Sequence, residues 1–271
     1  MTHTTEIRLI TELDELRAVE DLQRVVWGMS DREIVPATLM LAASRAGGVT
    51  LGAFVERALI GFCYGFLGVR DGALLFVSHM AGVEASHRSS GIGFLLKREQ
   101  RQAALARGAD RMVWTYDPMA NVNAHFNLHK LGAVAARYYV NYYGEMDDDL
   151  NRGLPSDRLE VDWWLRDPRV EALMHGEATA QAWTGPAALT RAAVAPRKPT
   201  LLLDAPVVRV EIPASFGELK RADHALALDW LLAVRSTLQH YFARGYQAVD
   251  FVVAAAAGSY ILQRGGRRRG R

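Results

Sequence analysis

The stretch at residues 74–132 constrains the fold more than any other part of this 271-residue chain. Residues 74–83 are apolar on both of their alternating faces, which is typical of a central strand that is covered on both sides. After the turn that ends at residue 91, the hydrophobic period changes from that of a strand to that of a helix. The sequence therefore predicts a strand, a tight turn and a helix in immediate succession.

The predicted helix at residues 91–107 has one apolar face. At helical spacing this face carries Ile92, Leu95, Leu96, Ala103 and Ala106. Three basic side chains are expected outside it, namely Lys97, Arg98 and Arg101. Gly108 is expected to end the helix, and residues 111–116 predict the next strand.

The junction between this strand and this helix is a candidate phosphate site. Its residues are Arg88, Ser89, Ser90, Gly91, Ile92 and Gly93. Backbone N–H groups at a helix N-terminus have no partner inside the helix, and the helix dipole favours an anion there. Glycine lets a phosphate approach the backbone, and arginine adds a charge-assisted contact. A plain glycine turn is the alternative, because short glycine motifs are weak signals.

The spacing Arg88-x-x-Gly91-x-Gly93 resembles the acyl-CoA pyrophosphate loop of the GNAT N-acyltransferase superfamily. The context is similar too, since a strand precedes the loop and a helix and a further strand follow it. A longer pattern resembles a narrower, largely uncharacterised GNAT-like acyltransferase family, and its segments are residues 78–80, 114–118, 123–127 and 157–158. The resemblance covers roughly residues 5–167.

This resemblance implies an α/β (α+β) architecture, the GNAT fold. Such a fold has a central mixed, mostly antiparallel sheet that is splayed around an acyl-CoA slot and flanked by helices. The cosubstrate would be acetyl-CoA or another acyl-CoA, with its arm beside the backbone of Ala81 and Val83 and its pyrophosphate on residues 88–93. Asn123 and Phe126 would face that arm from a helix expected at residues 121–130.

The resemblance also implies transfer of an acetyl or succinyl group to the amine of a small molecule, such as an amino acid or a derivative of one. The amine must lose a proton to attack, and the candidate bases are His79, Glu84 and Asp117. His79 titrates nearest to neutrality, although a structural histidine is the alternative. Arg158 could bind an acceptor carboxylate, and a salt bridge with Asp157 or another acid is its alternative role.

One departure from the superfamily concerns the general acid. A tyrosine often lies four residues before the glycine that ends the helix at 121–130, and this chain has Leu128 there. Four downstream tyrosines are substitutes among which the sequence does not choose: Tyr138, Tyr139, Tyr142 and Tyr143. A non-catalytic CoA-binding or regulatory module with a GNAT fold therefore stays open. A nucleotide-binding protein is a third interpretation, but neither a P-loop nor a full dinucleotide motif is visible.

Pro168 is a candidate boundary after the GNAT domain at residues 5–167. Residues 168–200 predict a short helix and a linker. Residues 201–264 predict a C-terminal α/β extension, a degenerate GNAT-like half that serves packing or homodimer formation. Its expected elements are strands at 201–203 and 207–212, a helix at 223–244 and a final strand at 246–253. Residues 265–271 predict a disordered basic tail.

Composition excludes several classes of protein. The formal net charge of +2 gives no support to nucleic-acid binding. Cys63 is the single cysteine, which rules out an intrachain disulfide or a cysteine metal cluster, and no metal is expected. The N-terminus lacks a signal-peptide pattern and no apolar run is long enough to cross a bilayer. These features predict a cytoplasmic protein with no membrane partner.

Overall fold

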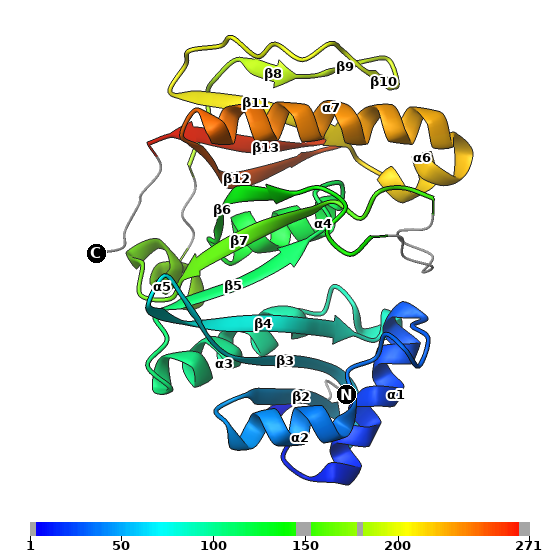
Figure 1. Ribbon diagram of the computed structural model, residues 1–271, viewed down its shortest axis with the longest axis vertical. Helices are drawn as coiled ribbons and strands as arrows, with labels where there is room; N and C mark the ends of the chain where they lie inside the picture. The colour runs from blue at the N-terminus through cyan, green and yellow to red at the C-terminus, as the bar shows by residue number, and fades with distance from the viewer. Residues whose placement is uncertain (1–3, 145–152, 178–180, 266–271) are drawn as a thin grey trace. The chain divides into compact units, whose positions relative to one another are not determined.

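The computed structural model describes residues 4–144, 153–177 and 181–265 (Figure 1). The chain forms two compact units, each described here by itself. Unit 1 comprises Met1–Trp114 and Trp164–Arg166, and unit 2 comprises Thr115–Trp163 and Asp167–Arg271. The boundary expected at residue 168 stays a prediction, and the basic tail beyond residue 265 lies outside the described residues.

Unit 1 is built on a sheet in the order β1-β2-β3-β4-β5. The strands are β1 (Glu6–Leu9), β2 (Val49–Val55), β3 (Ala58–Arg70), β4 (Ala73–Val83) and β5 (Arg111–Tyr116), of which β5 continues into unit 2. Neighbouring strands are antiparallel except β4 and β5, which are parallel. The helices are α1 (Leu13–Trp27), α2 (Ala37–Arg45), the 3₁₀ turn η1 (Ala85–His87) and α3 (Ile92–Ala106).

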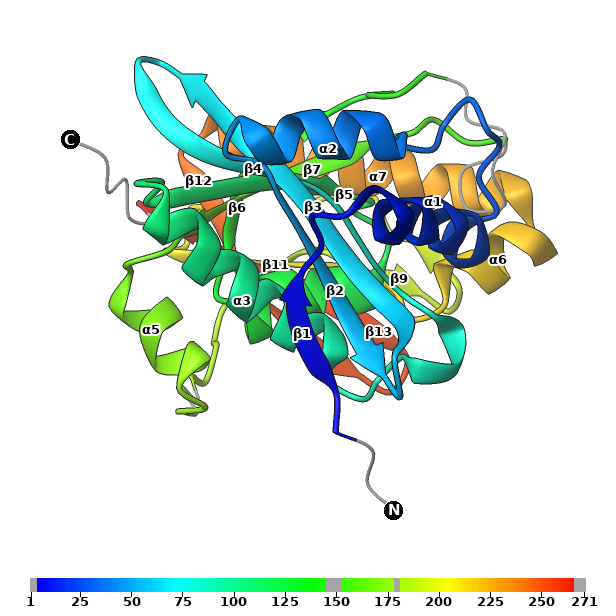
Figure 2. The same cartoon turned by 90° about the horizontal axis from the view of Figure 1, so that it is seen from below.

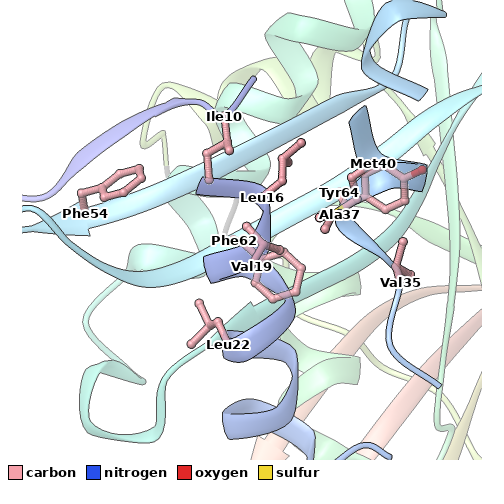
Figure 3. Close-up of a cluster of buried hydrophobic side chains, with 10 residues drawn as sticks. All are labelled: Ile10, Leu16, Val19, Leu22, Val35, Ala37, Met40, Phe54, Phe62 and Tyr64. Carbon is pink, nitrogen blue, oxygen red and sulfur yellow. The ribbon is translucent and has the colours of Figure 1, made fainter. Parts of the chain in front are cut away.

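Helices cover both faces of this sheet (Figure 2). Phe62 packs with α1 and α2, whereas the next residue, Cys63, donates to the Leu96 carbonyl of α3. Successive side chains of a strand point to opposite faces, so α1 and α2 cover one face and α3 covers the other. Figure 3 shows the core on the α1–α2 face, which consists of Ile10, Leu16, Val19, Leu22, Val35, Ala37, Met40, Phe54, Phe62 and Tyr64.

The buried face of α3 differs from the one expected. Lys97 and Arg101 are buried, together with Gln100, on the stripe that also carries Ile92, Leu96 and Ala104. Arg101 reaches the Leu165 carbonyl with its Nε at 2.8 Å, which satisfies a buried guanidinium. The expectation that Lys97 and Arg101 lie outside the buried face was wrong, because polar partners on the neighbouring segments draw both side chains inwards.

Unit 2 contains strands in the order β7-β6-β12-β13-β11-β8. They are β6 (Val134–Tyr139), β7 (Arg158–Trp164), β8 (Ala187–Leu189), β11 (Val207–Pro213), β12 (Tyr246–Ala254) and β13 (Ala257–Arg264), with a separate pair β9 (Arg191–Ala192) and β10 (Ala195–Pro196). Among the strand pairs described within this unit, β8 and β11 are parallel and the others are antiparallel. The helices are α4 (Asn121–Ala124), η2 (His125–Lys130), α5 (Pro168–Met174), α6 (Phe216–Ala222) and α7 (His224–Ala243).

The prediction of a mixed, mostly antiparallel sheet flanked by helices, with a C-terminal α/β extension, is confirmed. Details of unit 2 differ from the expectation. The helix at residues 121–130 widens into the π-helix η2, residues 201–203 form no strand, and β13 follows the strand that was expected to be last. In the part of the chain that the structure describes, no helix is long and apolar enough to cross a membrane.

Candidate functional site

The parallel ladder between β4 and β5 is short. It consists of two pairs, Phe76↔Met112 and Val77↔Val113, whereas β3 pairs with β4 as far as Val83. Within residues 4–144, the β4 edge from residue 78 onward therefore has no strand partner on the side opposite β3. We call the point after Val77 and Val113 the fork. Backbone groups along the open edge are available to a ligand, because strand N–H and C=O groups form hydrogen bonds wherever a partner is present.

A β-bulge lies at the start of this open edge. Tyr64 pairs with Met80 and Gly65 pairs with Ser78, so His79 is an extra residue on β4. The β4 backbone approaches Gly65 so closely that a Cβ there would lie 2.5 Å from the Val77 carbonyl oxygen. A bulge bends its strand and changes the direction of the side chains, so β4 does not continue straight beside β5.

His79 lies on the sheet face that carries α1 and α2. Its ring centroid is 6.0 Å from that of Tyr64, edge to face, and 6.1 Å from that of Phe66. These surroundings remove water from the imidazole and lower the pKa of His79 below its ordinary 6.5. The side chain is nevertheless part of the exposed surface. His79 is therefore neutral at physiological pH and able to accept a proton.

The loop after β4 opens α3 as the sequence predicts. Gly91 is the N-cap residue, with φ at +84°, and no side chain caps the helix. A Cβ on Gly91 would meet nothing within 4 Å, so the space above this residue is open. Uncapped N–H groups at the start of a fifteen-residue helix favour an anion, and the phosphate site expected here stays a prediction. Ser89 also adopts a positive φ, +67°, which is uncommon for serine.

Two side chains of the loop bind backbone groups of unit 1. The Arg88 guanidinium donates to the carbonyl of Val83 at 3.2 Å and to that of Val26 at 3.4 Å. Ser90 Oγ donates to the His87 carbonyl at 2.5 Å. Arg88 thus ties the loop to the end of β4 and to α1. Its role toward a phosphate stays a prediction, as do those of Ser89 and Ser90.

Glu84 is half-exposed directly after β4. Its backbone N–H donates to the Ile60 carbonyl, and its carboxylate lies 3.3 Å from His87 Nδ1. Ala81 and Val83 pair with β3 at Cys63 and Gly61, and both lie on the stretch of β4 beyond the fork. Unit 1 therefore brings together the candidate base His79, the open β4 edge and the loop at residues 88–93.

The remaining predicted residues belong to unit 2. Asp117 follows β5, and its Oδ1 accepts from the Met119 N–H at 2.8 Å. Burial raises the pKa of Asp117 above its ordinary 3.8, while the Met119 hydrogen bond and the positive charge of Arg158 oppose that rise. Asn123 is exposed on α4 and Phe126 is half-buried on η2. Nothing in the structure assigns Asn123 or Phe126 a ligand, and their roles stay predictions.

Arg158 contacts the backbone of its neighbour and an aromatic ring. Its Nη1 donates to the Asp157 backbone carbonyl at 2.8 Å, and its guanidinium lies 5.1 Å from the centroid of the Tyr143 ring. The Asp157 carboxylate binds Arg235 and the Tyr138 hydroxyl, the latter at 2.6 Å. Burial, followed by the charge of Asp157, raises the pKa of Tyr138 far above its ordinary value, which makes Tyr138 a poor general acid.

One polar residue near the fork was missed at the level of sequence. Lys97 is 3% exposed, and its Nζ donates to Ser78 Oγ at 2.9 Å. The signal that could have found it is its spacing, because Lys97 lies one and four residues from the buried positions 96 and 101. Within the described residues no three His, Cys, Asp or Glu side chains gather as a metal site would require.

No protein-family model matches this chain, and no curated protein matches it. Solved structures do. An acetyltransferase of the GNAT family from Streptococcus pneumoniae is 16% identical, with 59% of this chain and 98% of that chain covered and a TM-score of 0.48. The yncA protein of Salmonella typhimurium, solved with its cofactor acetyl-CoA, is 17% identical over 60% of this chain and 95% of that chain, with a TM-score of 0.47.

Arabidopsis thaliana Naa50, solved with a bisubstrate analogue, is 18% identical over 58% of this chain and 97% of that chain, with a TM-score of 0.46. The GNAT family named among these matches is the one that residues 88–93 resemble.

Proposed function

We propose that this protein is an acyl-CoA-dependent N-acyltransferase with the GNAT fold. The observation that carries the proposal is the arrangement within unit 1: an open β4 edge runs from the fork to Val83, and the uncapped N-terminus of α3 follows it after a short loop. A long ligand with a polar, amide-bearing arm and a pyrophosphate end fits these two features in that order. Coenzyme A has this constitution.

In this proposal the pyrophosphate lies on the N–H groups at Gly91, Ile92 and Gly93. The open space above Gly91 supports this position, because a side chain there would compete with the phosphate. The arm lies along β4 and forms hydrogen bonds with backbone groups near Ala81 and Val83. The thioester then comes close to the bulge at His79.

The reaction forms one C–N bond and breaks one C–S bond. The neutral amine of the acceptor attacks the thioester carbonyl carbon, and the carbonyl oxygen gains negative charge that backbone N–H groups stabilise. The amine proton passes to a base, and the departing thiolate of CoA takes up a proton. His79 is the base that we favour, because its lowered pKa keeps the imidazole neutral near pH 7. Glu84 and Asp117 are the other candidates.

The acceptor is proposed to be a small amine that carries a carboxylate, such as an amino acid or a derivative. A guanidinium binds a carboxylate with two parallel hydrogen bonds, and Arg158 is the residue proposed for this contact. Acetyl-CoA and succinyl-CoA are the two donors to test. The contact with the Tyr143 ring supports the role of Arg158, because a ring face 5.1 Å from the guanidinium helps to position it.

The deciding experiment measures thiol release from acetyl-CoA and from succinyl-CoA with a panel of amino acids of both chiralities, amines and peptides. CoA binding is followed in parallel by thermal shift, since a ligand of the native state raises the melting temperature. Amine-dependent release establishes the transferase. A thermal shift without release from any acceptor supports instead a CoA-binding module. The absence of both thiol release and a CoA-dependent thermal shift would contradict the proposal.

Once an acceptor is known, an Arg158→Met variant tests its recognition. We expect the KM for the acceptor to rise by about tenfold or more, since a charge-assisted pair is lost. The KM for the acyl-CoA should change little. A matched control is Arg166→Met, which removes an exposed arginine paired with Asp110. A larger effect of Arg158→Met on the donor than on the acceptor contradicts the assignment.

A further inference from the structure

Lys97 lies at the fork itself. The last ladder pair joins Val77 and Val113, so Ser78 and Trp114 are the first residues after the two strands part. The Lys97 Nζ atom donates to Ser78 Oγ at 2.9 Å and lies 3.7 Å from the centroid of the Trp114 ring. One side chain from α3 therefore contacts both strands at the point where they separate.

The surroundings of this amine consist of acceptors. Gln100 Oε1 lies 3.0 Å from Nζ and 2.8 Å from Ser78 Oγ, and the Met112 sulfur lies 3.6 Å from Nζ. Lone pairs and an aromatic face suit an ammonium group, which offers three N–H donors and accepts nothing. Gln100 is itself fully buried, and its Nε2 has no hydrogen-bond partner among the described residues. A buried donor without a hydrogen-bond partner destabilises the folded state, so this polar cluster is less stable than an apolar packing of the same space would be.

An apolar side chain of the same length would fill the position of Lys97 without the cost of burying an amine. The chain instead holds an amine where β4 and β5 part. Ser78, which Lys97 contacts, directly precedes the bulge residue His79 on the opposite face of the strand. Ser78 therefore links Lys97 to the residue at which the bulge begins.

We propose that Lys97 is a positioning residue. By contacting both β4 and β5 at the fork, it fixes the position of the open β4 edge and thereby strengthens the binding of the ligand's arm along β4. This inference rests on the proposed function, because the ligand in question is CoA. Lys97 acts through Ser78 and Trp114 and touches no reacting atom. The loop at residues 88–93 holds the other end of the ligand and does not depend on Lys97.

This positioning role depends on the charge of Lys97. Burial lowers the pKa of Lys97 to about 7, so the ammonium is lost as the pH rises above neutrality. Groups that face it come from β3, β4, α3 and β5, and they include Cys63, Ser78, Gln100, Met112 and Trp114. Cys63 alone among these titrates, and burial raises the pKa of its thiol to about 12, so it stays neutral over the range that matters.

The test compares two ligands on two variants. CoA probes the whole site, and adenosine 3′,5′-bisphosphate probes the nucleotide end without the arm. Lys97→Met keeps the length of the side chain and removes the charge and the donors. Arg98→Met is the matched control, because Arg98 is the next residue of α3 and is paired with Glu99 on the half-exposed face. Affinities are measured by calorimetry at pH 6.5 and pH 8.

For Lys97→Met we expect a loss of about tenfold in CoA affinity, since contacts of a charged group are removed, and no change for the bisphosphate. Arg98→Met should bind both ligands as the wild type does. The wild-type preference for CoA over the bisphosphate should be larger at pH 6.5 than at pH 8, and Lys97→Met should lack this difference. Equal losses for both ligands, or none for either, overturn the inference.

A second variant keeps the test decisive if Lys97→Met does not fold. Ser78→Ala removes the hydroxyl that accepts from Lys97 and donates to Gln100, and it leaves Lys97 itself in place. It should weaken CoA binding while the bisphosphate binds unchanged, and CoA affinity equal to that of the wild type overturns the inference. If the wild type itself does not bind CoA, the proposed function fails, which is a different outcome from the failure of Lys97 alone.

Discussion

The Asp157 carboxylate accepts two hydrogen bonds from the Arg235 guanidinium, at 2.8 Å and 3.0 Å. Asp157 is 1% exposed, and the pair joins the segment before β7 to the middle of α7. The same carboxylate accepts from the Tyr138 hydroxyl. This network anchors α7 inside unit 2, and it precedes Arg158 by a single residue.

Removal of Arg235 should destabilise the protein strongly. In Arg235→Met the Asp157 carboxylate stays buried without its cation, and breaking such a pair costs about 3 to 5 kcal/mol. Urea unfolding at pH 7 measures the change. Arg166→Met is the control, because its pair with Asp110 is exposed and contributes about 1 kcal/mol or less. If the two substitutions lower the free energy of unfolding equally, the buried network contributes no more to stability than an exposed ion pair does.

The pair also shows where sequence-based prediction ends. Arg235 lies 78 residues after Asp157, and no periodicity links the two positions. The strand, loop and helix at residues 74–107 were predictable because glycine positions and hydrophobic period are local signals. The bulge at His79 was not, since it is defined by the register of β4 against β3. A register is a relation between two segments and is not written in either one alone.

Two further misses have the same physical origin. Lys97 and Arg101 read as solvent-facing on charge alone, yet Ser78 and the Leu165 carbonyl supply partners from other segments. Residues 201–203 are apolar enough for a strand but form none, and Leu202 is among the most exposed apolar residues. Apolar runs predict burial only when a neighbouring segment is available to cover them.

A negative charge at Gly91 should abolish CoA binding. Gly91→Asp places a carboxylate where the proposed pyrophosphate lies, and we expect a loss of at least about a hundredfold in affinity, since like charges at close range repel. Gly72→Asp is the matched control. Gly72 also has a positive φ, +76°, and open space above it, so its substitution carries the same backbone strain at a different turn. Calorimetry with CoA measures both variants.

If Gly91→Asp binds CoA like Gly72→Asp does, the phosphate assignment of residues 88–93 is wrong. A circular dichroism melt of each variant separates loss of binding from loss of fold. Gly91→Asn then isolates charge from shape, because asparagine tolerates a positive φ and carries no charge. We expect Gly91→Asn to bind CoA more tightly than Gly91→Asp.

The pH dependence of the reaction should identify the base. The pKa of His79 is lowered, so the neutral, active form is already dominant at pH 6.5 and kcat/KM should fall only at lower pH. His79→Gln should remove this acid limb and reduce kcat by about 10² to 10⁴. Glu84→Gln and Asp117→Asn are measured beside it, with exposed His175→Gln as the control.

An acid limb that persists in His79→Gln and disappears in Asp117→Asn would transfer the role to Asp117. Burial raises the pKa of that carboxyl above its ordinary 3.8, and an Asp117 base must likewise be deprotonated to act, so it would also give an acid limb. The variant that loses the acid limb therefore identifies the base. The pH at which the limb occurs does not identify it.

Lys97 should lower stability where it is protonated. Its pKa of about 7 in the folded protein lies below the ordinary 10.5, so the unfolded chain binds more protons between these values and stability rises with pH across this window. Relative to Lys97→Met, the wild type should lose at most about 4 kcal/mol as the pH falls from 10 to 7. Urea unfolding of both proteins at pH 7 and pH 10 measures the difference.

A wild type that is no less stable than Lys97→Met at pH 7 would contradict the burial of the charge. A variant that is more stable and yet binds CoA less well would be the signature of a residue retained for function. Ser78→Ala should leave the difference between pH 7 and pH 10 largely in place, because burial of Lys97 is its main cause.

The fork also has a closed end. β4 and β5 are still paired at Val77 and Val113, so a molecule lying along the open edge can extend toward the fork but not past it. The open stretch runs from Ser78 to Val83, a length of about 15 to 20 Å at the usual rise of a strand. One end of this stretch leads into the loop at residues 88–93 and the other meets a stop. In the proposed complex, the part of the CoA arm that lies along β4 is therefore limited to this length, because the ladder at Val77 and Val113 blocks further extension.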